Sequence, residues 1–285
     1  MLAVVAALGS ALCYALASVL QQRAAAAEPL DQSLRVGLLT RLMLRPLWVL
    51  GIGADVLGYV LQFIALGHGT LVVVQPLLVS GLLFALPFGA LVSGRRMERR
   101  DWVGGGAVVV GLALFLVVAA PAKGRPVASG VTLAAIGVAT AVAAGALLLV
   151  ARGRNGSPRA MLLATAGGLL YGFTAALTKT AAHLLDRGVV HLLTSWPTYA
   201  LVAGGALGLL VTQSAFQAAP LAASLPMLTV VDPLASIAIG AFAFGENIAS
   251  SPVAVLAEVA GLAMLVWGVF TLARSPLVSG ARQGV

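Results

Sequence analysis

Apolar residues in this sequence fall into blocks of about 20, and this block length limits the possible folds more than any other feature. An α-helix of that length crosses a hydrocarbon core of roughly 30 Å. Inside such a core every backbone N–H and C=O group must be paired within the protein, which favours helices. A transmembrane barrel would instead show alternating segments of about 10 residues, and the sequence has none. We therefore predict an all-α integral membrane protein.

The composition supports this prediction. Hydrophobic residues make up 60% of the chain and charged residues only 9%, whereas a soluble domain needs roughly 25% charged residues to cover its surface. The net charge of +8 comes almost entirely from arginines in short loops between the apolar blocks. Arginines placed in this way fit membrane topology and anionic headgroups. The predicted partners are therefore membrane lipids, and not nucleic acid.

Nine apolar blocks predict nine membrane-spanning helices. A tenth segment, residues 33–45, is leucine-rich but contains Arg35, Arg41 and Arg45. It either lies at the interface as an amphipathic helix or crosses as a short tenth helix inside the bundle. The nine predicted spans are residues 2–22, 46–67, 70–93, 102–120, 129–150, 159–183, 197–218, 221–243 and 252–272.

The loop charges predict an orientation in the plasma membrane. With nine spans, one side has only Lys123, Arg125 and Arg187. The opposite side has thirteen arginines and also contains the C-terminus. Because basic loops stay in the cytoplasm, this side is predicted to be cytoplasmic. The N-terminus then lies outside with nine spans and inside with ten. The arginines of the basic side are Arg23, Arg35, Arg41, Arg45, Arg95, Arg96, Arg99, Arg100, Arg152, Arg154, Arg159, Arg274 and Arg282.

Two parts of the chain resemble each other at a shift of about 150 residues. Residues 58–76 align with 208–226, and Gly111-Leu112-Ala113 aligns with Gly261-Leu262-Ala263. Tyr14 pairs less strictly with Tyr171. An odd number of crossings separates the copies, so they face opposite ways, as in many secondary carriers.

This repeat predicts the domain organisation. The first repeat covers residues 1–123, with four helices and the short helix at 33–45. A linking helix follows at residues 124–158. The second, inverted repeat covers residues 159–285.

Ionisable residues inside the predicted spans are candidate functional groups, because inserting each costs roughly 2.5–3.5 kcal/mol. Asp232 lies near the middle of the eighth span, directly before Pro233, which predicts a helix broken beside an acid. Asp232 would then bind an ion or a proton, or it would cap the broken helix or pair with a neighbouring cation. Asp55 lies in the second span with Gln62 on the same face. Glu258 lies nearly two turns into the last span.

Four further polar residues in the spans are candidates for the same site. Lys179 is either the positive partner of Asp232 or Asp55, a ligand for an anionic substrate group, or a side chain that reaches the headgroups. Gln75 precedes Pro76, which we expect to open a helix, as the repeat-related Pro226 does. Gln213 and Tyr14 suit a hydrogen-bonding ligand, although amides also join helices to one another.

Short motifs in both copies resemble the drug/metabolite transporter superfamily, EamA-type, over nearly the whole chain. Within it the chain is most similar to the NIPA-like branch, whose members are described as magnesium transporters. That branch has an acidic residue after the glycine that aligns with Gly58, whereas this chain has Tyr59. The motifs are Pro46-Leu47-Trp48, Gly51, Gly58, Phe63, Ala65, residues 71–77, Arg95-Arg96-Met97, Gln213, Ala215, residues 221–226 and Gly245-Glu246.

We predict a secondary transporter that moves a small organic or amphiphilic solute by alternating access, without a cofactor. Asp232 and Asp55 would bind the coupling proton or the substrate's cation. The alternatives are a NIPA-like transporter of magnesium or another divalent cation, with these two carboxylates as ligands, and a flippase for a lipid-linked carrier. No catalytic motif indicates an enzyme. The sequence leaves a monomer and a homodimer open.

Overall fold

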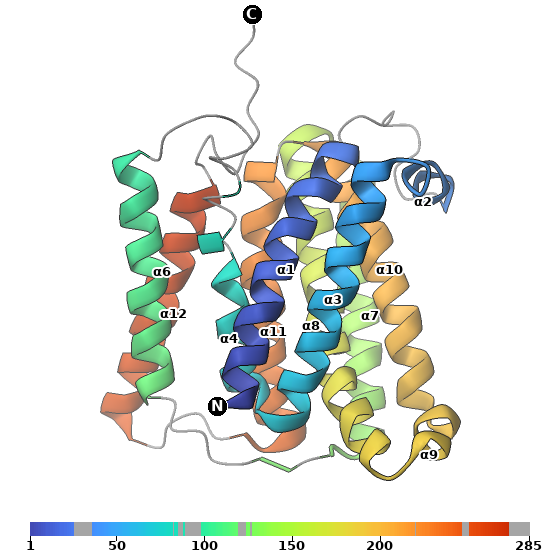
Figure 1. Ribbon diagram of the computed structural model, residues 1–285, viewed down its shortest axis with the longest axis vertical. Helices are drawn as coiled ribbons and strands as arrows, with labels where there is room; N and C mark the ends of the chain where they lie inside the picture. Colours follow the sequence, from blue (N-terminus) through green and yellow to red (C-terminus); the bar gives the residue numbers. More distant parts are fainter. Residues whose placement is uncertain are drawn as a thin grey trace, which may run out of the picture.

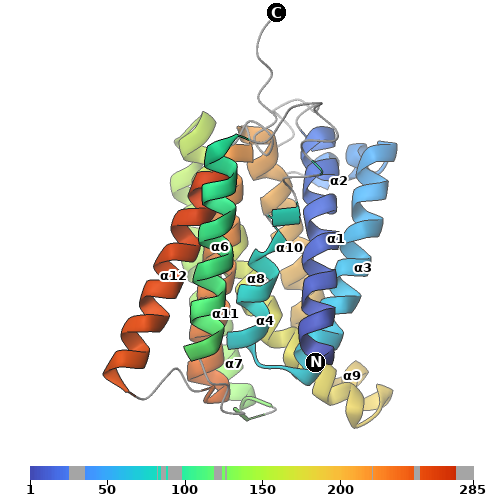
Figure 2. The same cartoon turned by 60° about the vertical axis from the view of Figure 1, so that its left-hand side comes forward.

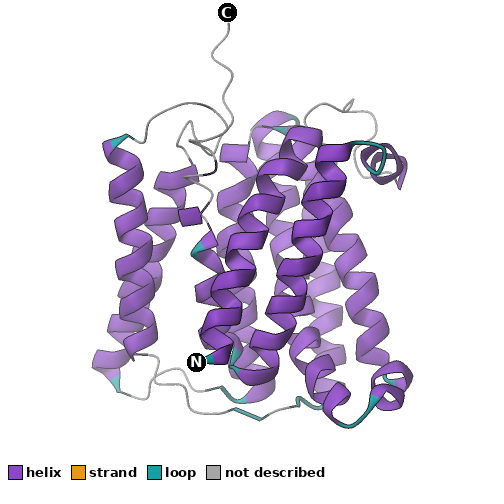
Figure 3. Ribbon diagram, in the orientation of Figure 1, coloured by secondary structure: helices purple, strands orange, loops and turns teal. Residues whose placement is uncertain are grey.

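The computed structural model describes residues 1–25, 36–81, 83–84, 88, 98–118, 124–125, 127–219, 221–246 and 251–273. Every regular element in these ranges is an α-helix (Figure 3). Seven of the helices are long and apolar enough to cross a membrane. They are α1 (Leu2–Ala25), α3 (Pro46–His68), α7 (Gly130–Arg152), α8 (Gly156–Asp186), α10 (Trp196–Ala218), α11 (Leu221–Phe244) and α12 (Pro252–Ala273). The predicted all-α class with membrane-spanning helices is confirmed.

Two other predicted spans correspond to shorter or partly described helices. The span predicted at 102–120 is α6 (Arg99–Val118), a helix of 20 residues that packs along α12 (Figure 2). The span predicted at 70–93 begins as α4 (Leu71–Val79), and most of its second half lies outside the described residues. A further short helix, α9 (Val189–Thr194), follows α8.

The segment at 33–45 contains α2 (Val36–Leu42), a helix of seven residues. At 1.5 Å per residue it is roughly 10 Å long, which is too short to cross a core of about 30 Å. Leu38 and Leu42 are fully buried, while Arg41 is exposed. This amphipathic burial favours an interfacial helix over a tenth crossing. Arg35, the first arginine of the segment, lies outside the described residues.

Helix α8 is the centre of the bundle and packs against α3, α7, α10 and α11. Small residues allow this close packing in lipid, because they let two backbones approach. A Cβ atom added at Gly168 would lie 2.9 Å from the Val231 side chain, and one at Gly172 would lie 2.6 Å from that of Ala235. Both contacts are with α11, so this pair of glycines fixes α11 against the central helix.

Helices α6 and α12 meet at two glycines that the sequence repeat relates to each other. A Cβ atom added at Gly111 would lie 2.6 Å from the Gly261 carbonyl oxygen, and one at Gly261 would lie 2.9 Å from the Gly111 carbonyl oxygen. The contact is thus backbone against backbone, with no room for a side chain on either helix.

Helices that the predicted repeat pairs with each other run in opposite directions. In Figure 1, α3 descends while α10 rises, and α4 rises while α11 descends. Likewise α6 descends and α12 rises beside it. The start of α1 and the end of α12 lie at opposite ends of the bundle.

The basic helix ends gather at one end of the bundle. The described arginines of the basic set are Arg23, Arg41, Arg45, Arg99, Arg100, Arg152, Arg154 and Arg159, all at or near helix ends at the top of Figure 1. Arg125 and Arg187 belong to the lower end. The remaining charges used to predict orientation lie outside the described residues, namely Lys123, Arg35, Arg95, Arg96, Arg274 and Arg282.

We predict that Gly111→Leu lowers the stability of the protein by about 1–3 kcal/mol, because its side chain would force α6 and α12 apart. The measurement is the thermal unfolding midpoint of the protein in detergent micelles, followed by size-exclusion chromatography. Gly106→Leu on the same helix is the control, since a Cβ atom there meets nothing within 4 Å. Equal midpoints for the two variants would contradict the packing described.

Candidate functional site

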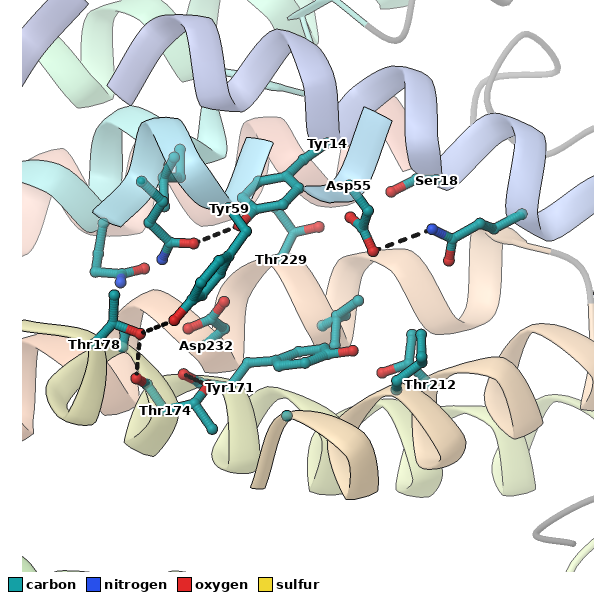
Figure 4. Close-up of a pocket in the computed structure, with 18 of the residues that line it drawn as sticks. Tyr14, Ser18, Asp55, Tyr59, Tyr171, Thr174, Thr178, Thr212, Thr229 and Asp232 are labelled. Carbon is teal, nitrogen blue, oxygen red and sulfur yellow. Dashed lines mark hydrogen bonds between the residues drawn. The ribbon is translucent and has the colours of Figure 1, made fainter. Parts of the chain in front are cut away.

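A cavity of about 600 Å³ lies between α1, α3, α4, α8, α10 and α11 (Figure 4). Its size is within the range typical of small-molecule sites, roughly 300–1,000 Å³. Aliphatic and aromatic side chains make up much of its wall, among them Ile52, Leu201 and Phe216. Its polar lining consists of Tyr14, Ser18, Gln21, Asp55, Tyr59, Gln62, Gln75, Tyr171, Thr174, Thr178, Thr212, Thr229 and Asp232.

Two carboxylates from different halves of the chain face this cavity. Asp55 of α3 accepts a hydrogen bond from Gln21 Nε2 at 3.1 Å, and Gln21 Oε1 accepts one from Gln213 Nε2 at 2.5 Å. Asp232 of α11 accepts a hydrogen bond from the Ser236 hydroxyl at 3.2 Å. In the part of the chain that the structure describes, neither carboxylate has an ion-pair partner, and no Lys, Arg or His lines the cavity.

Helix α11 continues through Asp232, so the predicted break at Pro233 is wrong. The sequence also predicted that Pro76 and Pro226 each open a helix. Both instead lie inside a helix, Pro76 in α4 and Pro226 in α11. Proline still lacks an N–H, so the carbonyl of Thr229, one turn before Pro233, receives no helical hydrogen bond from it. Neighbouring groups can compensate for such a loss inside a helix bundle. The acid therefore lies beside a weakened but unbroken helical turn.

Three tyrosines point into the space that contains the two aspartates (Figure 4). Tyr14 donates to Gln62 Oε1 at 2.5 Å. The Tyr59 hydroxyl lies 3.2 Å from the Thr178 hydroxyl. Because Thr178 donates its own proton to the Thr174 carbonyl, it accepts the hydrogen bond from Tyr59. 

The third tyrosine, Tyr171, points its hydroxyl towards Thr212 (Figure 4). Tyr14 and Tyr171 line the same cavity as Asp55 and Asp232. The two acids thus share one aromatic and hydroxyl-rich environment.

Glycines on the neighbouring helices make room for two of these aromatic rings. A Cβ atom at Gly58 would lie 2.9 Å from the ring of Tyr14, and one at Gly208 would lie 2.8 Å from the ring of Tyr171. Gly58 and Gly208 are equivalent positions in the sequence repeat. Each ring therefore packs against bare backbone, which holds its hydroxyl at the cavity.

Gln75 adds an amide to the cavity wall. The residue is 1% exposed, and its Nε2 has no hydrogen-bond partner among the described residues. A buried donor left unpaired costs about 1–3 kcal/mol. An acceptor on a bound ligand or a water molecule in the cavity would satisfy it.

A buried ion pair lies beyond the cavity, at the lower end of the bundle in Figure 1. Lys179 of α8 donates to Glu246, which follows the end of α11. The same carboxylate accepts the backbone N–H groups of Leu71 and Val72, at the start of α4, at 3.2 and 3.1 Å. Lys179 also lies 4.6 Å from the ring centroid of Phe244. One carboxylate thus joins α4, α8 and the end of α11.

The uncharacterized protein Cgl0250/cg0304 of Corynebacterium glutamicum is 34% identical to this chain over 279 residues. The alignment covers 96% of this chain and 95% of the relative. The chain belongs to the family of this protein. The similarity therefore extends over nearly the whole length of both chains. No family model and no solved structure matches the chain.

The structure brings five of the eight predicted site residues to the cavity, namely Asp232, Asp55, Gln62, Gln75 and Tyr14. Gln213 does not line the cavity, but its amide donates a hydrogen bond to Gln21, which does. Lys179 pairs with Glu246 instead of either aspartate. Glu258 is buried on α12, outside the cavity lining.

Helical spacing could have identified several residues that the sequence reasoning did not place in the site. Asp55, Tyr59 and Gln62 recur at intervals of four and three residues, so they share one face of α3. Tyr171, Thr174 and Thr178 do the same on α8. Thr212 occupies the position equivalent to Gln62 in the repeat. Thr229 shows the same signal, because it precedes Asp232 by three residues on α11.

We predict that Lys179→Met destabilises the protein by about 3–5 kcal/mol, because it leaves a buried carboxylate without its cation. The double variant Lys179→Met/Glu246→Gln is expected to be more stable than Lys179→Met alone. Denaturant titration in detergent micelles measures both.

The control for this prediction is the exposed pair between Arg100 and Glu98, whose side chains are 45% and 58% exposed. Because solvent screens it, Glu98→Gln should change stability by less than about 1 kcal/mol. A Lys179→Met effect as small as that of Glu98→Gln would show that the buried pair does not hold the helices together.

Proposed function

We propose that this protein is a secondary transporter of the drug/metabolite superfamily, EamA-type, which moves a small organic or amphiphilic solute by alternating access. The observation that carries this proposal is the cavity itself. It contains two carboxylates, one from each half of the chain, and neither has a cationic partner among the described residues. Acids held within a membrane-spanning bundle are typical of ion or substrate pathways.

An inverted repeat would explain why the cavity has matching walls. Tyr14 and Gly58 pack together in the first half as Tyr171 and Gly208 do in the second. Counterpart helices run in opposite directions (Figure 1). We propose that residues 1–123 and 159–285 form these two copies, giving nine spans with residues 124–158 as the link.

Two copies of opposite orientation would provide the two states of a carrier, with the substrate site at their interface. Gly111 and Gly261, equivalent positions that touch each other, would lie close to the axis that relates the copies. The buried ion pair between Lys179 and Glu246 closes the lower end of the bundle in one state. A rocking motion would move this pair as a unit or break it.

In this proposal Asp232 and Asp55 bind the coupling proton or the positive charge of the substrate. The amides of Gln62 and Gln75 orient the rest of the ligand. The end of the bundle that carries most of the described arginines faces the cytoplasm, with the protein in the plasma membrane.

The proposal is tested by flux into proteoliposomes that contain the purified protein, under an imposed proton gradient. Labelled cationic, zwitterionic and neutral organic solutes form one panel, and magnesium with an internal indicator forms the other. We expect saturable uptake of an organic solute, which Asp232→Asn lowers to the level of empty liposomes because the pathway has lost its central charge. Asp186→Asn, at an exposed position at the end of α8, should transport as the wild type does.

The outcomes separate the alternatives. Saturable magnesium flux that Asp232→Asn abolishes, without organic flux, would favour the divalent-cation transporter. Absence of flux in both panels, with folded protein, would contradict transport altogether. If Asp232→Asn takes up solute at the wild-type rate, the Asp232 carboxylate is not required for transport.

A further inference from the structure

The cavity reaches the outer surface of the bundle between α3 and α10. Val56 of α3 and Val202 of α10 both line the cavity, and they are 58% and 68% exposed. Each helix packs on α1 and α8, but α3 and α10 form no comparable interface with each other. Because both helices are membrane-spanning candidates, residues exposed between them would face lipid in a bilayer. The gap is therefore a lateral opening towards the bilayer.

The charges of the cavity indicate the sign of its occupant. Asp55 and Asp232 are its only charged lining residues in the described chain. The rings of Tyr14, Tyr59 and Tyr171 surround the same space (Figure 4). Aromatic faces attract cations, and quaternary ammonium groups in particular. An anion would meet two carboxylates and no basic side chain.

The rest of the wall indicates that most of the occupant is apolar. Ile52, Leu209, Phe216, Leu225 and Leu228 line the cavity beside the polar groups. A hydrated metal ion would leave this surface wet, whereas an apolar chain would cover it. A volume of about 600 Å³ also exceeds what a small ion needs.

We propose that the cavity binds an amphiphilic organic cation, which enters from the bilayer through the opening between α3 and α10. The cationic head lies between Asp55, Asp232 and the tyrosines. The apolar tail lies against the leucines and extends through the opening towards the lipid. This inference rests on the proposed transport function and specifies its substrate class and its entry route.

Gly205 offers a direct way to block the opening. It lines the cavity on α10, and a Cβ atom added there meets nothing within 4 Å. The first atom of a new side chain at Gly205 therefore meets no neighbouring helix, and Gly205→Phe places its ring at the cavity. Gly145 of α7 is equally open and does not line the cavity, so Gly145→Phe is a matched control for adding a phenyl group to a transmembrane helix.

The experiment measures binding of radiolabelled dodecyltrimethylammonium to the protein in nanodiscs of zwitterionic lipid, corrected by empty nanodiscs. Tetramethylammonium tests the need for the tail, and dodecyl sulfate tests the need for positive charge. We expect saturable binding of the long-chain cation and none of dodecyl sulfate. Asp232→Asn and Asp55→Asn should each weaken it at least about tenfold, because each removes a charge that faces the head group.

Blocking the opening should act on the rate of binding. Gly205→Phe is expected to slow association of the long-chain cation at least about tenfold, while Gly145→Phe stays within about twofold of wild type. Val202→Trp is a second blocking variant, should Gly205→Phe fail to fold by size-exclusion chromatography. If tetramethylammonium binds as tightly as the long-chain cation, or if the blocking variants match the control, the proposal is overturned.

The binding experiment and the flux experiment test different proposals, so one can fail while the other succeeds. Proton-driven uptake of a neutral solute without any cation binding would keep the transport proposal and overturn the cationic substrate. Saturable binding of the cation without flux of any solute would support the site and contradict transport.

Discussion

The buried ion pair between Lys179 and Glu246 is the contact on which the geometry of the cavity depends. Neither charge is stable alone in a medium of low dielectric constant, because removing an ion from water costs several kcal/mol. Glu246 is further stabilised by the first backbone N–H groups of α4, where a helix favours a negative charge. Three helices must therefore stay in one register for these groups to meet.

That register also places the functional groups. Asp232 lies on α11, Gln75 on α4 and Tyr171 on α8. These are the three elements that the ion pair joins. A shift of any one of them by a turn, about 5.4 Å, would separate the carboxylate, the amide and the hydroxyl from one another. The glycines at the contacts of α8 with α11 keep the spacing as well as the register, since α8 has no side chain at these positions. Packing and site thus come from the same residues.

Hydropathy was sufficient to predict the helical membrane class, and a helical face was sufficient to put Asp55 and Gln62 on the same side of α3. Both are local patterns along the chain. The partner of Lys179 was not predictable in this way, because Glu246 follows α11 and is 67 residues away. The continuity of α11 through Pro233 was also missed, since the surrounding bundle and not the proline decides whether a helix breaks. Tertiary packing overrides local preference at both positions.

The distribution of charge separates Asp55 and Asp232 from the other ionisable groups of the described chain. Most described arginines lie at helix ends, where headgroups and water solvate them. The one fully buried pair of opposite charges in the described chain neutralises itself. Asp55 and Asp232 follow neither pattern, because amide and hydroxyl donors reach them but no cation of the described residues does. Packing does not require two such acids in an apolar bundle, where small residues already provide the close contacts. Their presence within one cavity fits a positive charge that arrives from outside the protein.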